Sequence, residues 1–119
     1  MTDFPSMRPD VAKLLHDTRT ACAAIAVFTQ GKDFAAYAAD NLLRSAVERQ
    51  FEIVGEALGR AVRRDPGLEK VIPEIHRIVG LRNRLIHGYD SVDDQLLWDL
   101  VQVKLPALAR LLDEVLMTG

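Results

Sequence analysis

Apolar residues recur at intervals of three and four along most of the chain, the spacing that places side chains on one face of an α-helix. The pattern predicts a first helix that begins between Ser6 and Pro9, with Ser6 as its cap, and ends at Gly31. A second, long helix is predicted to start after Asp33 and to run to about Arg64. Each helix carries one continuous apolar face, as the elements of a packed bundle do.

Two further helices are predicted in the second half of the chain. The third begins within residues 68–73, where proline is tolerated in a first turn, and ends at Gly88. The next opens near Ser91, whose side chain is a candidate cap with Asp94 reaching back from three residues later. Pro106 removes a backbone hydrogen bond from that helix, so a kink or a fresh start is expected there.

The periodicity predicts an all-α fold, an up-and-down bundle of four or five helices, because no stretch alternates as a β-strand does. A length of 119 residues suits one domain that spans residues 1–119. The predicted core stripes are Val11, Leu14, Leu15, Cys22, Ile25 and Phe28 in the first helix, Leu43, Val47, Phe51, Val54, Leu58 and Val62 in the second, and Leu97, Val101, Leu105, Leu108, Leu112 and Val115 in the last.

Composition narrows the class of protein. The chain is 49% apolar and 27% charged with a formal net charge of -2, so any contact with nucleic acid must come from a local patch of positive charge. The longest apolar run, residues 21–28, is too short for a membrane span, and residues 1–6 do not resemble a secretory signal. The single cysteine, Cys22, lies on an apolar face, where we interpret it as a packing residue of a cytoplasmic protein.

The richest chemistry lies in the stretch Gly80-Leu81-Arg82-Asn83-Arg84-Leu85-Ile86-His87-Gly88-Tyr89. On a helix, Arg82 falls in the middle of an apolar stripe. A charge is almost never fully buried without a partner, so the stripe is expected to open onto a cleft or an interface. The other members of that stripe are Ile75, Ile78, Val79, Leu85, Ile86 and Tyr89.

A second row on the same helix holds His76, Gly80, Asn83 and His87. The middle of this row has no side chain, because residue 80 is glycine. A glycine inside a helix lowers its stability relative to alanine, so another helix or a ligand is expected to approach closely there. Asn83 and His87 are four residues apart and can form a hydrogen bond that sets the imidazole tautomer. A second bare strip, at Gly55 and Gly59, indicates either a close crossing of two helices within one subunit or a dimer contact.

This stretch resembles the signature of the HEPN (higher eukaryotes and prokaryotes nucleotide-binding) domain family, an arginine followed after four to six residues by a histidine. Here Arg82, four residues and His87 match it. Asn83 after the arginine, and Gly88-Tyr89 after the histidine, look like the HepT-type toxins of bacterial toxin and antitoxin pairs. The resemblance implies a homodimeric, metal-independent endoribonuclease with no cofactor of its own.

The chemistry of RNA cleavage agrees with a dimer. The 2′-hydroxyl must lose a proton, the crowded phosphorane must be stabilised and the leaving oxygen must gain a proton. One arginine and one histidine are too few, and a two-fold dimer supplies a second copy of each. By resemblance, Arg82 binds phosphate and transition-state charge, His87 transfers protons, and Asn83 orients His87 or touches substrate. Arg77 and Arg84 add to a basic patch that suits phosphate.

Tyr89 has a separate role in HepT-type systems. There the antitoxin is a small nucleotidyltransferase that uses ATP and Mg²⁺ to transfer AMP onto the tyrosine two residues after the histidine. An anionic adenylate on Tyr89 would occupy the basic cleft and exclude RNA. The resemblance therefore implies two partners, an RNA and a nucleotidyltransferase of the MNT (minimal nucleotidyltransferase) type.

Several simpler interpretations stay open. Arg82 can form a structural ion pair with Glu48 or Glu52, His87 can cap a helix end, and Tyr89 can pack in the core. The whole chain can be a HEPN domain without nuclease activity that binds nucleotide or a partner, or a structural helical dimer. A carboxylate metal site is not predicted, because such bundles use Glu-x-x-His pairs and this sequence has none.

Overall fold

A computed structural model describes residues 8–87 and 93–118, with the backbone alone for residues 86, 87 and 118. Over these residues the chain is helical and contains no strand, so the all-α prediction is confirmed. The elements are α1 (Pro9–Thr29), α2 (Phe34–Ala39), α3 (Asn41–Arg64), α4 (Leu68–Val71), α5 (Ile75–His87), α6 (Asp94–Asp99), the π-helical segment η1 (Leu100–Lys104) and α7 (Leu105–Thr118).

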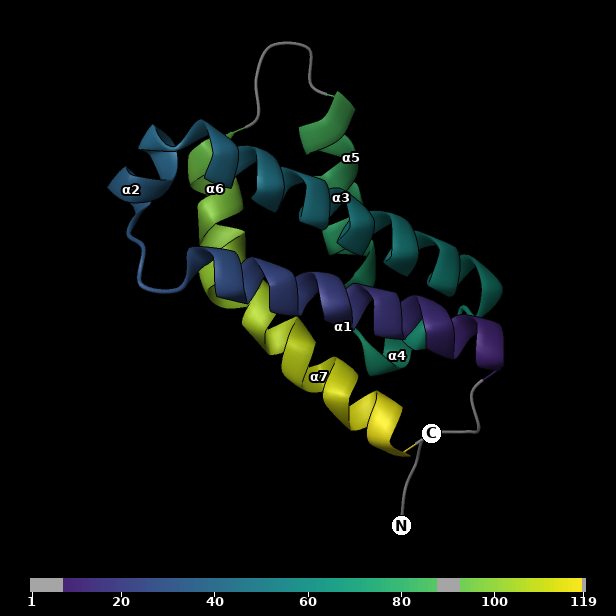
Figure 1. Cartoon of the computed structure of the whole chain (residues 1–119). Coiled ribbons are helices and arrows are strands. Elements are labelled where there is room, and N and C mark those ends of the chain that lie inside the picture. The colour runs from purple at the N-terminus through teal and green to yellow at the C-terminus, as the bar shows by residue number, and fades with distance from the viewer. Residues whose placement is uncertain (1–7, 88–92, 119) are drawn as a thin grey trace.

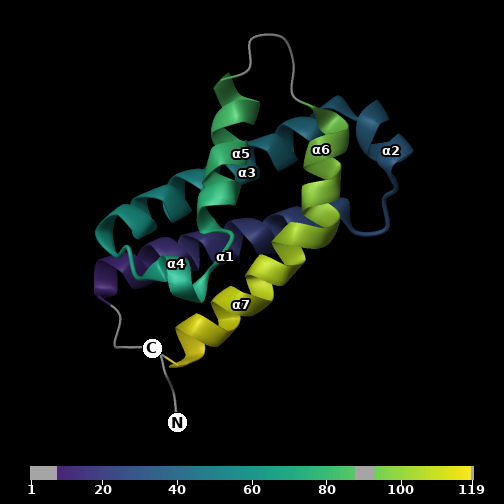
Figure 2. The ribbon, with the colours of Figure 1, turned by 180° about the vertical axis from the view of Figure 1, so that it is seen from behind.

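Helices α1 and α3 lie side by side and run in opposite directions (Figure 1). Helix α5 crosses α3 steeply, while α6, η1 and α7 follow one another as a single bent rod whose α7 part packs on α1 (Figure 2). Four long helical units therefore enclose the core, and α2 and α4 are short connectors. The arrangement agrees with the predicted bundle of four or five helices.

The predicted core stripes of α3 and of the last helix are buried at every position, and α1 is buried at all but one. The exception is Phe28, which is 37% exposed, so its prediction as a core residue was wrong. The buried face of α1 continues from Ile25 to Thr29, four residues on, and Thr29 satisfies its hydroxyl by donating to the Ile25 carbonyl at 2.8 Å. Cys22 is buried, and burial raises its pKa to about 12, which agrees with a packing role.

The predicted long second helix is two helices, which corrects the sequence-based boundary. Asp40 interrupts it in an extended conformation, and its side chain accepts a hydrogen bond from the Leu43 backbone at 3.0 Å. Asp33 caps α2 in the same way through Ala36 at 2.8 Å. An aspartate that can satisfy free amide groups starts a helix more readily than it continues one.

The first helix begins at Pro9 as predicted, but Arg8 precedes it and makes no side-chain cap, and Ser6 lies outside the described residues. The third predicted helix is split into α4 and α5, with Pro73 between them. The cap of α6 is Asp93, which accepts from the Leu96 backbone at 3.0 Å. Gly88 and Ser91, predicted as a helix end and a cap, lie outside the described residues.

The expected disturbance at Pro106 is present as the segment η1, which ends two residues before the proline. The Leu105 amide reaches back to the Leu100 carbonyl, five residues away, in place of the usual four. A wider turn accommodates the missing amide hydrogen and the bulk of the proline ring. The rod bends there and continues as α7.

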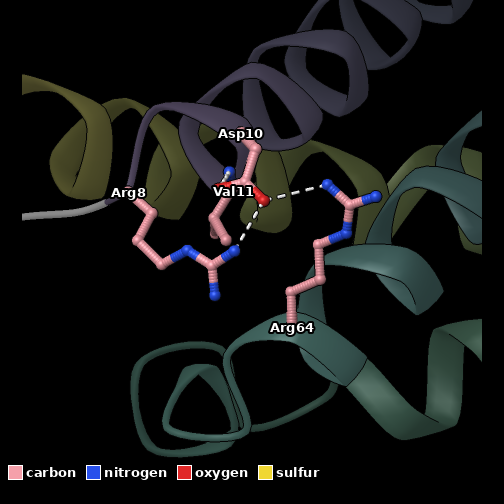
Figure 3. Close-up of polar contacts among 4 residues, drawn as sticks. All are labelled: Arg8, Asp10, Val11 and Arg64. Atoms are coloured by element: carbon pink, nitrogen blue, oxygen red, sulfur yellow. Dashed lines mark hydrogen bonds and ion pairs between the residues drawn. The ribbon is translucent and has the colours of Figure 1, made fainter.

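Asp10 ties the start of α1 to the end of α3 (Figure 3). Its carboxylate accepts hydrogen bonds from Arg8 and Arg64, each at 2.9 Å, and from the Val11 amide at 3.0 Å. Desolvation opposes ionisation, but the two arginines and the amide outweigh it and lower the pKa of Asp10. The bridge holds α1 and α3 together at the end of the bundle away from α2.

Candidate active site on helix α5

Helix α5 packs one side against α3 and carries the predicted signature. Ile75, Ile78 and Leu85 are buried, whereas Val79 and Arg82 in the same stripe are only partly buried. The charge in the middle of the apolar stripe therefore sits at the edge of the α3–α5 contact, where its stem is covered and its end reaches the surface. The stripe is therefore open to the surface at Arg82, and the cleft or interface expected there stays a prediction.

The stem of Arg82 lies directly over Gly55 of α3. A Cβ added at Gly55 would fall 2.9 Å from Cδ of Arg82 and closer still to its Cβ and Cγ. Real Cβ atoms essentially never come that near, so only glycine fits there. Of the two sequence-based interpretations of the Gly55 and Gly59 strip, the crossing of two helices within one subunit is the one observed.

The guanidinium of Arg82 makes few polar contacts with the described residues. Its Nη1 donates to Oδ1 of Asn83 at 3.0 Å, and its Nε is buried with no hydrogen-bond partner. Within residues 8–87 and 93–118 it forms no ion pair; Glu52 pairs with Arg49 at 3.8 Å instead. The alternative in which Arg82 is bound to Glu48 or Glu52 is therefore not found.

His87 is the last residue of α5, five residues beyond Arg82, which corresponds to about 7.5 Å along a helix axis. Its side chain lies outside what the structure describes, and so does the whole of Tyr89. The structure thus leaves the Asn83–His87 hydrogen bond and the adenylylation of Tyr89 as predictions. It does show that Asn83 is exposed and that its carbonyl oxygen is engaged by Arg82.

The other basic side chains that the structure describes on α5 have contacts of their own, and these do not show the single basic patch expected from sequence. His76 pairs with Glu69 at 2.9 Å and Arg77 with Glu74 at 3.7 Å. Arg77 and Arg84 line a separate groove of about 460 Å³. Its other lining residues are Gly80, Leu81, Leu96 and Leu100, from α5, α6 and η1.

The bare position at Gly80 is exposed, and no described atom lies within 4 Å of where its Cβ would be. The close approach expected there is therefore not made by another described part of this chain. A second copy or a ligand stays as the prediction for that surface. Sequence reasoning noticed both glycine strips but did not foresee that one of them receives Arg82.

A helical bundle with an arginine that reaches the surface near the end of a late helix is consistent with the HEPN class of proteins. Residues 18–115 match the family model described as Ribonuclease HepT-like. The chain belongs to the HepT-like ribonuclease family.

Individual relatives agree with this assignment. The chain is 33% identical over 103 residues to a Methanocaldococcus jannaschii protein named "Putative RNase MJ1380", covering 85% of this chain and 92% of that protein. It is 33% identical over 96 residues to the "Probable ribonuclease HepT" of Thermococcus cleftensis, covering 79% and 84%. No solved structure matches the chain significantly.

Residues 8–87 and 93–118 lack two features that would bear on function. No helix among them has the length and the apolar character that crossing a membrane requires. They also contain no group of three or more His, Cys, Asp or Glu side chains placed to hold a metal ion.

Proposed function

We propose that this protein is a homodimeric, metal-independent endoribonuclease in which Arg82 and His87 act on the scissile phosphate. The observation that carries the proposal is the state of Arg82. Its stem is fixed against α3, its charged end reaches the surface, and no described carboxylate neutralises it. An arginine held in this way is suited to an anionic ligand, because a guanidinium donates two parallel hydrogen bonds to phosphate oxygens.

The roles of the residues follow from the chemistry of the reaction. His87 takes the proton of the 2′-hydroxyl or gives one to the leaving 5′-oxygen, since imidazole titrates near neutral pH. Arg82 stabilises the charge that develops on the phosphorane. Asn83 holds Nη1 of Arg82 and stands one helical turn before His87, so it keeps the arginine oriented toward the same region.

Two copies are part of the proposal because proton removal and proton donation need two separate groups. Helix α5 packs against α3 on one side and exposes Gly80 and Asn83 on another. A two-fold pairing through that exposed surface would bring two His87 residues and two Arg82 residues toward one RNA strand. The bare backbone at Gly80 is compatible with such a close approach.

We further propose that a nucleotidyltransferase antitoxin of the MNT type silences the protein by transferring AMP from ATP, with Mg²⁺, onto Tyr89. Tyr89 follows His87 by two residues, so an adenylate there would place a negative charge beside the cationic site and compete with RNA. Co-expression with such a partner is expected to add the mass of one or more AMP units to a peptide that contains Tyr89. A Tyr89→Phe variant should gain no mass and should remain active in the presence of the partner.

The nuclease is tested by incubating the purified protein with RNA in EDTA. The wild type is expected to cleave, whereas Arg82→Ala and His87→Ala lose on the order of a hundredfold or more in rate. Arg82→Lys is expected to be similarly impaired, because an ammonium group keeps the charge but not the paired donors.

Matched controls separate catalysis from charge and folding. Arg110→Ala removes one exposed positive charge from α7, and His76→Ala removes the exposed histidine of α5; both should cleave like the wild type. RNA or nucleotide binding without cleavage by the wild type would instead favour a non-catalytic HEPN subunit. The names of the two relatives described above support the nuclease.

A further inference from the structure

We infer that Gly55 is a positioning residue for Arg82, and that the notch it leaves in α3 determines how the guanidinium meets phosphate. This inference rests on the proposed nuclease function and extends it to a residue on a different helix. The signature itself contains no glycine of α3. The contact is visible only where α5 crosses α3.

The first step concerns the atoms that meet at the crossing. A Cβ on residue 55 would clash with Cβ, Cγ and Cδ of Arg82. Rotation of the arginine side chain can move Cγ and Cδ but not Cβ, which is fixed to the backbone of α5. Any side chain at position 55 therefore forces α5 itself away from α3 at the level of Arg82.

The second step concerns the direction of the guanidinium. With its stem in the notch, Arg82 has its Nε buried and unpartnered, while Nη1 is held by Asn83. The side edge formed by Nε and Nη2 is therefore closed to a phosphate. The terminal edge formed by Nη1 and Nη2 is the one that can bind, since each of these nitrogens carries two hydrogens and Asn83 uses only one.

Gly59 provides a matched control on the same face of α3. It is also buried, but a Cβ there would meet Val79 Cγ1 at 3.6 Å and Arg63 Nη1 at 3.5 Å, which are ordinary contacts. Gly59→Ala thus introduces the same methyl group and the same gain in helix propensity without moving Arg82.

The test compares Gly55→Ala with Gly59→Ala in RNA cleavage and in urea unfolding. Gly55→Ala is expected to lower kcat about a hundredfold, because a shift of about 1 Å in a catalytic group costs that much. Gly59→Ala should stay within about twofold of the wild type. Equal cleavage by Gly55→Ala and wild type would overturn the inference.

A double-mutant cycle of Gly55→Ala and Arg82→Gly, measured by urea unfolding, distinguishes this contact from a general loss of stability. The Arg82→Gly change removes all three of the clashing atoms. Gly55→Ala should lower the urea midpoint in the wild-type background and leave it unchanged or raised in the Arg82→Gly background. If Gly55→Ala alone does not fold and the double variant does, the contact is supported. If both fail to fold, or the midpoint falls equally in both backgrounds, the inference is overturned.

The two readouts also separate this inference from the proposed function. If the wild-type protein cleaves no RNA, the nuclease proposal fails, while the unfolding cycle still reports whether residue 55 acts through Arg82. If the wild type cleaves and the unfolding cycle shows no coupling, the inference on Gly55 fails by itself.

Discussion

Charged side chains in this protein are held in two different ways. Arg82 keeps its stem in a glycine notch and its terminal nitrogens available. Arg44, in contrast, is fully engaged: it bonds to the Ala38 carbonyl and to Asn41, and it pairs with Asp94 at 3.7 Å. These contacts of Arg44 join α2, α3 and α6, and they engage all three nitrogens of the guanidinium. Arg44 therefore stabilises the packing of helices, whereas Arg82 is suited to binding a ligand.

Glu48 is a carboxylate that the fold disfavours in its ionised form. Its pKa is raised mainly by burial and further by Asp94 and Glu52, and Arg44 opposes the rise only in part. The stability that Glu48 contributes is therefore present below its ordinary value of 4.5 and is lost as the pH rises through its higher folded value. At neutral pH, ionised Glu48 therefore lowers the free energy of unfolding.

We accordingly predict that Glu48→Gln increases the free energy of unfolding at about pH 7 by less than about 1 kcal/mol, because solvent screens half-exposed charges. The difference should vanish below about pH 4, where Glu48 is protonated in both states. Urea unfolding at the two pH values measures it. A loss of stability at neutral pH would contradict the expectation.

Asp113 serves as the control of opposite sign. Its pKa is lowered, chiefly by the hydrogen bond from Arg19 at 2.7 Å, which joins α7 to α1. The stability it contributes is present above its ordinary value of 3.8 and is lost as the pH falls. Asp113→Asn should therefore weaken the protein at neutral pH and have little effect in acid.

At the scale of elements, breaks between helices follow local polar groups more than the apolar pattern. The stripe of α3 is uninterrupted, yet the helix begins only at Asn41, because Asp40 satisfies the free Leu43 amide. The predicted continuous helix from Asp33 failed because the apolar period does not register such a cap. Pro106 was easier to foresee, since a proline always removes a donor.

Asp40 offers a direct test of this interpretation. Asp40→Ala is expected to lower the free energy of unfolding by about 1 kcal/mol, the usual cost of losing an N-terminal cap. Asp40→Ser should retain most of the stability, because a serine hydroxyl also accepts from a backbone amide. Equal stability of the alanine and wild-type proteins in urea would show that the cap does not hold the start of α3.

At the scale of the whole molecule, the bundle presents Arg82, Asn83 and the backbone of His87 along one helix. A single chain supplies one copy of the signature arginine, Arg82, and one copy of the signature histidine, His87. The proposed mechanism therefore depends on assembly. Helix α5 has room for a second copy at Gly80, where no described atom lies within 4 Å of the position that a Cβ would take.

The assembly is predicted to be a dimer with twice the 13.3 kDa mass of one chain, measurable by sedimentation equilibrium. Because Gly80 is exposed and open, Gly80→Gln would obstruct a second copy while leaving the monomer folded. The variant is expected to sediment as a monomer and to lose cleavage. A wild-type protein that is monomeric and active would refute the need for a second copy.

The sequence by itself determined the helical class, the buried stripes of α3 and of the rod formed by α6, η1 and α7, and the resemblance of one motif to a ribonuclease family. These features depend on residues three or four positions apart or on one contiguous motif, and both can be recognised without knowing how helices pack. The Arg-x4-His signature and Asn83 could likewise be recognised from the sequence alone. The burial of Cys22 was also predictable, because its neighbours on the helix face are apolar.

Only the tertiary structure decided what surrounds the signature. It put the stem of Arg82 against Gly55, left its Nε buried, and separated Arg77 and Arg84 into another groove. The distance between α3 and α5, and the angle at which they cross, set all three results. Those quantities arise from packing between residues far apart along the chain, so no local pattern of apolar and polar positions contains them.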